Sequence, residues 1–311
     1  MNAIQIKKQK EYHNRIDANI LKNINNPSIK KTKKKVFTND IKKAISELAG
    51  INDIKGIITI LENFVQGVTD YKVNSNEYNI NKFLPWLKGE TSNLPYKVFK
   101  VGNSKLPFLN FSTLPIVTCS GSGICETYCY SLKAWRYPSA FLSQVQNTLL
   151  MFKFNIIEDE LNKLIYNKRT KLGKLNKIDF RLYVDGDFNT LEDLTNWMNL
   201  LKKNNKVKTY GYSKSLNLFL QLSDMAYNFP KNYALNLSNG GTYDSLKPYL
   251  INLPFVRGNF TAIKSTKKDI RKQFKNKVFI CPGNCGTCTN KGHACGNMDT
   301  FKNIEIVIPI H

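Results

Sequence analysis

Hydrophobic and polar positions follow two different patterns along the chain, and the change falls near residue 96. Before it, residues 40–68 carry apolar side chains three and four positions apart, which predicts two short helices separated by glycines. Residues 1–35 are polar and rich in Lys and Asn, which is typical of a frayed helix or a disordered arm. The pattern therefore predicts a basic, helical N-terminal extension over residues 1–95.

From residue 96 onwards, short β-rich runs alternate with helical stretches. The strands that we expect are residues 108–118, 179–188, 207–214, 232–241, 255–263, 278–281 and 303–311. The helices that we expect are residues 139–168, 190–204, 215–228 and 242–250. Strands that alternate with helices in this way form parallel βαβ units. We therefore expect an α/β domain over residues 96–311, built as a partial or complete parallel βα barrel or as a doubly wound sheet.

Lysine dominates the charge of the chain, because 46 Lys and Arg residues face 23 acidic residues and give a net charge of +23. Two basic runs stand out, Lys30–Lys35 and Lys264–Lys277, and a nucleic-acid backbone is the simplest partner for them. Only six of the basic residues are Arg, the usual reader of phosphates and guanine. An AT-rich gene would also enrich the chain in Lys, Asn and Ile. Nucleic-acid binding and codon bias both remain open.

The apolar content bears on where the protein acts. The chain is 42% hydrophobic, which is enough to bury a sizeable core. It contains no run of eighteen apolar residues, and its first residues lack the apolar region of a secretion signal. We therefore expect a cytoplasmic protein without a membrane span, in a compartment that keeps thiols reduced. The oligomeric state does not follow from the sequence.

All seven cysteines fall into two short segments. The first segment contains Cys119, Cys125 and Cys129, and the second contains Cys281, Cys285, Cys288 and Cys295. Clustered thiols in a reducing compartment bind metal more often than they form disulfides. We therefore expect all seven to be metal ligands, either in two sites or around a single site where the two segments meet.

The second segment has the spacing C-x3-C-x2-C-x6-C, with glycines in every gap. Four thiolates on one such loop can hold an iron–sulfur cluster, and [4Fe–4S] is the form that we expect. The alternative is structural zinc, held by four thiolates or by three thiolates and His293. Zinc sites usually pair two well-separated knuckles, so the single run favours the cluster.

The first segment offers three thiols, and three protein ligands leave an open coordination position where a metal can do chemistry. Tyr128 and Tyr130 flank its last cysteine and could shield a cluster from water. Lys133 and Arg136 follow at helical spacing and could contact anions near it.

Polar residues follow three of the expected strands, and the carboxyl ends of parallel strands usually face the site. Asp185 and Asp187 could act as an acid–base pair or bind a cationic group. The alternative is that they form a turn or cap helix 190–204, whose first turn carries Thr190 and Asp193 as a capping box. Lys214 could bind phosphate or carboxylate. The other candidates for cofactor binding at these strand ends are Tyr212, Asn236 and Ser238.

Residues 113–138, TLPIVTCSGSGICETYCYSLKAWRYP, are followed by FRLYVDGDF and TYGYSK. This succession resembles the phage- and plasmid-borne gene product eighty-eight family, in which a TC…C…CYA-x-K-x-x-R-x-YP stretch precedes strands ending in SGDF and YTK. The resemblance runs from about Thr113 to Cys295 and implies an origin in a phage or other mobile element.

The layout of that family is similar to the radical SAM superfamily, in which a three-cysteine loop follows an early strand and further cysteines follow the βα units. This resemblance implies a radical-SAM-like barrel, S-adenosylmethionine at the open iron of the first cluster, and an auxiliary cluster. The usual C-x3-C-x2-C spacing occurs here at Cys281–Cys288, whereas the early loop has gaps of five and three residues.

The sequence therefore predicts an iron–sulfur protein of a phage or mobile element, and whether it is an enzyme stays open. The alternative is a metal-stabilised nucleic-acid-binding protein without catalysis, in which zinc or iron–sulfur sites are structural and the two basic runs contact phosphates.

Overall fold

The structure is a computed structural model, and it describes residues 81–83, 85–87, 89–131, 138–274, 278–290 and 292–309. Most of the N-terminal extension expected over residues 1–95 lies outside these residues, as do Lys30–Lys35, Lys133 and Arg136. The domain boundary expected near residue 96 stays a prediction.

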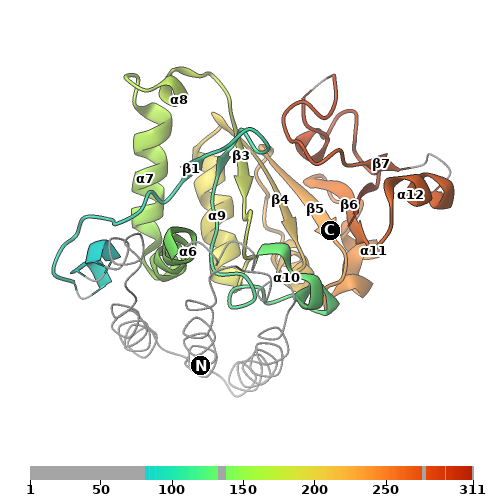
Figure 1. Ribbon diagram of the computed structural model, residues 1–311, viewed down its shortest axis with the longest axis horizontal. Helices are drawn as coiled ribbons and strands as arrows, with labels where there is room; N and C mark the ends of the chain where they lie inside the picture. The colour runs from blue at the N-terminus through green and yellow to red at the C-terminus, as the bar shows by residue number, and fades with distance from the viewer. Residues whose placement is uncertain are drawn as a thin grey trace, which may run out of the picture. The chain divides into compact units, whose positions relative to one another are not determined.

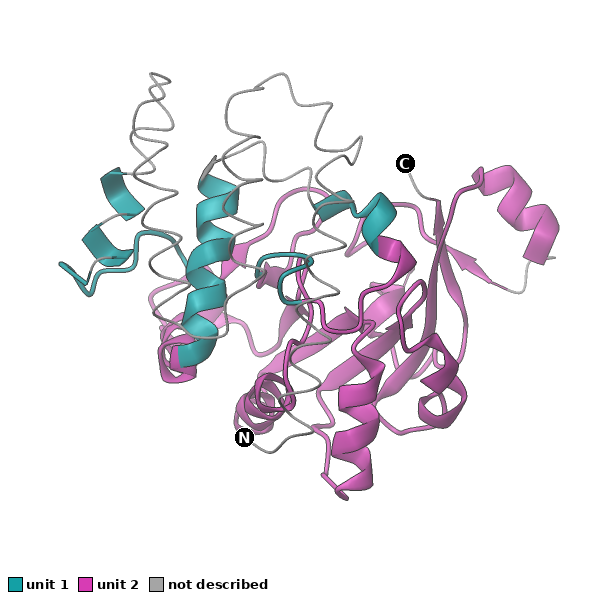
Figure 2. Cartoon of the chain, turned by 90° about the horizontal axis from the view of Figure 1, so that it is seen from below, with its two compact units in different colours: residues 1–98, 113–118, 126–152 teal, residues 99–112, 119–125, 153–311 magenta. Residues whose placement is uncertain are grey.

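The chain divides into two compact units, which Figure 2 shows in different colours. Unit 1 contains residues 1–98, 113–118 and 126–152, and unit 2 contains residues 99–112, 119–125 and 153–311.

An eight-stranded sheet forms the centre of unit 2 (Figure 1). Its strands in spatial order are β1 (Lys100–Val101), β2 (Leu109–Asn110), β3 (Ile178–Leu182), β4 (Val207–Ser213), β5 (Tyr233–Ser238), β6 (Val256–Ile263), β8 (Ile306–Pro309) and β7 (Phe279–Ile280). β1 pairs antiparallel with β2, and all the other neighbouring pairs of the sheet are parallel. Its two edge strands, β1 and β7, leave the sheet open within the described residues. The α/β class is confirmed, and the barrel is neither confirmed nor excluded.

Helices connect most of the parallel strands. The α-helices are α6 (Pro138–Leu150), α7 (Phe154–Tyr166), α8 (Lys171–Lys174), α9 (Leu191–Lys203), α10 (Leu216–Asp224), α11 (Lys247–Leu250) and α12 (Lys267–Phe274). The 3-10 helices are η1 (Ile124–Tyr128), η3 (Met151–Lys153), η4 (Asp244–Leu246) and η5 (Ala294–Gly296). None of the helices in the described ranges is long and apolar enough to cross a membrane.

Four expected elements differ from the structure. The strand expected over 108–118 forms only at β2, Leu109–Asn110, and the helix expected over 242–250 consists of η4 and α11. The helix expected over 139–168 is divided into α6 and α7 by η3; α6 belongs to unit 1 and α7 to unit 2. The strand expected over 179–188 ends at Leu182, because the next residue, Tyr183, has a left-handed backbone with φ of 55°. Asp185 and Asp187 therefore lie in the loop after β3 rather than in the strand.

One face of the sheet packs against α9 and α10. Successive strand residues point to opposite faces, so β3 buries Phe180 against the Trp197 indole of α9, with ring centroids 6.0 Å apart. Phe219 of α10 stacks on Tyr233 of β5 with centroids 6.3 Å apart. The capping box expected at Thr190 is confirmed, because its hydroxyl accepts from the Asp193 N–H and the Asp193 carboxylate accepts in return. These apolar contacts form the main core of unit 2.

The opposite face of the sheet carries both polar and apolar side chains. We call it the tail face and define it by Arg181 of β3, Tyr210 and Tyr212 of β4, and Ala234 and Asn236 of β5. The register sets Arg181 beside Tyr210, Tyr210 beside Ala234, and Tyr212 beside Asn236. The segment that contains the last four cysteines packs over this face, so β5 is buried along its whole length.

Unit 1 is organised around α6. The Gln146 side chain pairs with both backbone groups of Tyr96 at 2.9 Å, and Asn147 donates to the Val98 carbonyl at 3.0 Å. Thr148 accepts from the Leu114 N–H at 3.0 Å. The helix therefore holds residues 96–98 and residue 114 of unit 1 in place.

Candidate thiol-rich site

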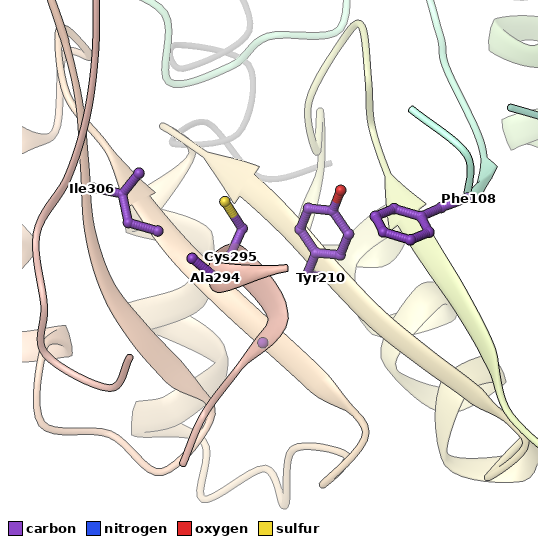
Figure 3. Packing of buried hydrophobic residues seen from close by; sticks show 6 residues of the cluster. Phe108, Tyr210, Ala294, Cys295 and Ile306 are labelled. Atoms are coloured by element: carbon purple, nitrogen blue, oxygen red, sulfur yellow. The ribbon is translucent and has the colours of Figure 1, made fainter. Parts of the chain in front are cut away.

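The four cysteines of the C-terminal segment gather on the tail face. Cys295, on η5, is 7% exposed and belongs to a buried cluster with Phe108, Tyr210 and Ile306. Figure 3 shows Cys295 between Ile306 and Tyr210, with the Phe108 ring beyond Tyr210. The remaining members of this segment, Cys281, Cys285 and Cys288, pack against the same cluster. None of the seven cysteines, all within the described residues, forms a disulfide.

The thiols of this segment interact electrostatically. Burial raises the pKa of Cys281, and the neighbouring Cys285 and Cys288 raise it further. Burial also raises the pKa of Cys295 to about 12, and Cys281 adds to the shift. Burial and mutual repulsion therefore both disfavour the thiolate form of these cysteines unless a positive charge, such as a metal ion, lies beside them.

Hydrogen-bond donors surround the sulfurs. The Tyr212 hydroxyl bonds the Cys295 thiol, whereas the buried Tyr210 hydroxyl has no hydrogen-bond partner among the described residues. The backbone N–H of Ala294 donates to the Cys288 Sγ at 3.4 Å. Donors aimed at sulfur stabilise its thiolate form.

The backbone of the segment is anchored to the sheet and folds back between the cysteines. The N–H of Cys281 donates to the Val307 carbonyl and that of Cys285 to the Lys105 carbonyl, both at 2.8 Å. Asn236 donates to the Cys295 carbonyl at 3.0 Å. The gaps between cysteines contain left-handed residues at Gly283, Gly286 and Gly292, with φ of 93°, 90° and 94°. The turns that the glycines predicted are confirmed.

His293 is engaged through both ring nitrogens. Its Nδ1 accepts from the Gly296 N–H at 3.1 Å, and its Nε2 lies 3.4 Å from the Asp179 Oδ1. The ring packs between Phe108 and Tyr210, with centroids 4.7 and 4.6 Å away. His293 therefore serves to position η5, which carries Cys295.

The donor set of the segment suits a thiophilic metal, because soft thiolates select zinc, copper(I) and iron–sulfur clusters. Among the described residues, no three His, Cys, Asp or Glu side chains are placed closely enough to hold a metal ion. An open hollow of about 360 Å³ reaches Cys288 from the surface. It is lined by Phe279, Cys288, Thr289, Asn290, Thr300 and Phe301. The donor types fit a metal centre, and the ligation itself stays a prediction.

Residues 119–125 of the first cysteine segment pack against the carboxyl ends of β4 and β5. A Cβ on Gly121 would lie 1.9 Å from the Lys214 carbonyl oxygen, so the two backbones are in direct contact. Ser120 donates to the Phe188 carbonyl at 2.9 Å, and the Cys125 N–H donates to the Gly240 carbonyl at 3.0 Å. Cys119 and Cys125 belong to unit 2, whereas Cys129, Tyr128 and Tyr130 belong to unit 1. The three-cysteine centre therefore stays a prediction.

The candidates at the strand ends have specific partners. Asp187 is buried, and its carboxylate accepts from the Ser213 hydroxyl and from the N–H groups of Phe188 and Lys214, each at 2.8 Å. Burial raises the pKa of Asp187, although these hydrogen bonds oppose the shift. The Lys214 ammonium donates to Ser238 at 2.9 Å. Asp187 therefore connects β3 to β4, and a catalytic role for it, for Asp185 or for Lys214 stays a prediction.

The structure also reveals two residues that sequence reasoning missed, Arg181 and Arg257. Arg181 lies over the Tyr212 ring at 4.9 Å, and Arg257 is fully buried beside Asn236. Both are among the six arginines and fall inside expected strands, where a charged residue is unusual. A rare residue type inside an expected strand was the sequence signal that could have identified these two residues.

The open, mostly parallel sheet and the cysteines packed on one of its faces define a thiol-rich α/β protein. The model of the family described as Gene product 88 matches residues 83–303, about seven tenths of the chain. The chain belongs to this family, and the resemblance noted from its motifs is confirmed. No curated protein and no solved structure matches the chain.

Proposed function

We propose that this protein binds an iron–sulfur cluster, most simply [4Fe–4S], through Cys281, Cys285, Cys288 and Cys295. The observation that carries the proposal is the gathering of all four thiols against one buried cluster of the tail face. The three left-handed glycines fold the backbone back between successive cysteines. Cysteines that only fill space in a core would not require such turns.

The ligand set favours four thiolates. The zinc alternative with three thiolates requires a free nitrogen on His293, and both of its nitrogens have protein partners. The single run of four cysteines also differs from the paired knuckles of most structural zinc sites.

The surrounding residues would protect and tune the centre. Phe108 and Tyr210 would exclude water, while the Tyr212 hydroxyl and the Ala294 N–H would bond sulfur. A bound cluster supplies electron storage, or an open iron where one thiolate is replaced by substrate.

Metal analysis tests the proposal. Iron, sulfide and zinc per chain are measured in anaerobically purified wild type and in the variants Cys288→Ser and Cys125→Ser. We expect about four irons with matching sulfide, lost in Cys288→Ser and retained in Cys125→Ser. If the wild type contains zinc and no sulfide, the cluster proposal is wrong and the zinc site is favoured. If the wild type contains no metal, both proposals are refuted.

The first segment carries a second part of the proposal, which rests on its three cysteines and the radical-SAM-like resemblance. An open cluster on Cys119, Cys125 and Cys129 would bind S-adenosylmethionine and cleave it reductively. This second cluster would add about four irons to the four of the C-terminal segment, and the added irons alone would be lost in Cys125→Ser. Reduced protein would then produce 5′-deoxyadenosine. Absence of cleavage in protein that retains both clusters would reject this part alone.

Nucleic-acid binding is the second candidate, and α12 favours it. This helix buries only Ile270 and exposes Lys267, Lys268, Arg271 and Lys272. Its one acid, Asp269, is bonded to Thr266 at the start of the helix. The Lys267 ammonium donates to the Pro282 carbonyl at 3.3 Å, which connects α12 to the cysteine segment. A phosphate backbone complements such a face.

Salt-dependent DNA binding tests this candidate. Wild type should bind duplex DNA with a steep loss of affinity as salt rises, and Lys268→Gln/Lys272→Gln should bind more weakly with a shallower slope. Lys163→Gln is the control, because Lys163 is equally exposed but pairs with Glu160 on α7. Failure of the wild type to bind even at low salt would reject the candidate.

A further inference from the structure

The hollow beside Cys288 has two aromatic walls. Phe279 of β7 and Phe301 meet edge to face in it, with ring centroids 5.2 Å apart and ring planes at 79° to each other. Both residues are only partly buried, although they pack against the buried cluster of the tail face. Their remaining ring surface is therefore open to a flat ligand that enters the hollow.

Polar side chains line the rest of the hollow. They are Thr289, Asn290 and Thr300, of which Asn290 and Thr300 are exposed. The Thr289 hydroxyl donates to the Gly292 carbonyl at 2.6 Å, and the two backbones pair in both directions, so the turn that carries Asn290 is fixed. The Asn290 amide can donate and accept hydrogen bonds at once, and the polar edge of a nucleobase offers both kinds of group.

The size of the hollow suits a single flat group. Its volume of about 360 Å³ lies near the lower end of the range of small-molecule sites, which is about 300–1,000 Å³. Of the four C-terminal cysteines, all of them within the described residues, Cys288 alone is among the lining residues. The hollow therefore lies beside the thiol cluster and not within it, so it can hold a ligand of its own.

The basic face of α12 lies close to this hollow. The helix contacts β7, the strand that supplies Phe279 (Figure 1). The Lys267 ammonium also bonds the Pro282 carbonyl, just beyond the end of β7. All the basic residues of α12 are exposed. A ligand that uses both features must therefore be flat at one point and anionic at the next.

We propose that the hollow and the basic face of α12 form one binding surface for single-stranded nucleic acid. An unpaired base lies against Phe279 and Phe301 with its edge at Asn290, and the neighbouring phosphates lie on α12. Bases in a duplex are covered by their neighbours in the stack, whereas an unpaired base can place its face on an aromatic ring. The inference rests on the nucleic-acid candidate above and specifies the form of the nucleic acid and the place of one base.

Binding of three DNA probes to the full chain tests the inference. The probes are a labelled single strand of about twelve nucleotides, the same strand annealed to its complement, and an abasic strand of the same length. Fluorescence anisotropy at one fixed salt concentration gives each affinity. Wild type should bind the single strand about tenfold more tightly than the abasic strand, because stacking of a base adds to the phosphate contacts. It should also bind the single strand more tightly than the duplex, whose base faces are covered.

Two variants remove the groups that would contact the base. Phe301→Leu keeps an apolar side chain without a ring, so it should bind the single strand about tenfold more weakly and the abasic strand as wild type does. Asn290→Ala should bind the single strand about threefold more weakly. The controls are Phe152→Leu, because Phe152 is 58% exposed on η3, and Asn284→Ala, because Asn284 is exposed in the same segment but outside the hollow. Thermal unfolding and metal content are measured for each variant, and if Phe301→Leu does not fold, Asn290→Ala decides.

The outcomes separate the inference from the candidate function on which it rests. If wild type binds none of the probes at low salt, both are wrong. If the single strand and the abasic strand bind equally well and both variants bind like wild type, nucleic-acid binding stands and the base site is overturned. If a free nucleotide binds as tightly as the single strand, the hollow is a small-molecule site and the single-strand surface is overturned.

Discussion

The two cysteine segments are held to the sheet of unit 2 in different ways. Residues 119–125 approach the strand ends through small residues, and Gly121 contacts the backbone of Lys214 directly. Residues 281–295 approach through their cysteines, which pack against aromatic rings of the tail face. The first segment is therefore positioned by backbone contact, whereas in the second the thiols themselves are part of the packing.

This difference predicts different responses to perturbation. A segment fixed by backbone contact is sensitive to added volume and insensitive to what its thiols bind. A segment whose thiols are packed together depends on the state of those thiols, because a bound centre stabilises the folded form by mass action.

The largest expected effect is that of Gly121→Ala. The new Cβ would lie 1.9 Å from the carbonyl oxygen and 2.2 Å from the carbonyl carbon of Lys214, and backbone atoms cannot yield. The free energy of unfolding should fall by more than about 3 kcal/mol, measured by denaturant titration. Gly283→Ala is the matched control, because nothing lies within 4 Å of its Cβ position and only its φ of 93° costs about 1–2 kcal/mol. Equal losses would contradict the comparison.

Metal removal should act on the second segment. Chelation of the centre should lower the stability of the chain by about 3 kcal/mol at metal concentrations a hundredfold above Kd. Hydrogen exchange should increase at the anchored amides of Cys281 and Cys285 and stay unchanged at Cys125. Loss of protection at all three amides would mean that the two segments are not independent.

Asp187→Ala should have a somewhat smaller effect. It leaves the Ser213 hydroxyl and two backbone N–H groups without their acceptor, which should cost about 2–3 kcal/mol. Asp185→Ala, two residues earlier in the same loop and only partly buried, should change stability by about 0.5 kcal/mol or less. If Asp187→Ala retains wild-type stability but loses an activity, the acid–base interpretation is favoured over the anchoring one.

The smallest expected effect is that of Tyr212→Phe. The ring still packs, but one donor to the Cys295 sulfur is lost. We expect a loss of about 1 kcal/mol or less, seen as weaker Co²⁺ binding. Tyr249→Phe is the control, because Tyr249 is 71% exposed. A large loss of folding stability in Tyr212→Phe without metal would assign the hydroxyl a structural role instead.

The sequence by itself determined the secondary-structure alternation, the capping box at Thr190, the family, and the gathering of thiols into two segments. β4, β5 and β6 lie within the ranges expected for them, because short runs rich in β-branched and aromatic residues between turn signals indicate strands. The glycine turns between the last four cysteines were also readable, since few other residues adopt a left-handed backbone.

Only the tertiary structure decided which groups meet. The last strand, β8, inserts between β6 and β7, and no local pattern encodes that order. The bulge that turns Arg257 inward, the end of β3 at Leu182 and the bonds that engage His293 each depend on residues distant in the chain. Periodicity reports how deeply a residue is buried, whereas its partners depend on strand order and register, and these are set by packing of the whole sheet.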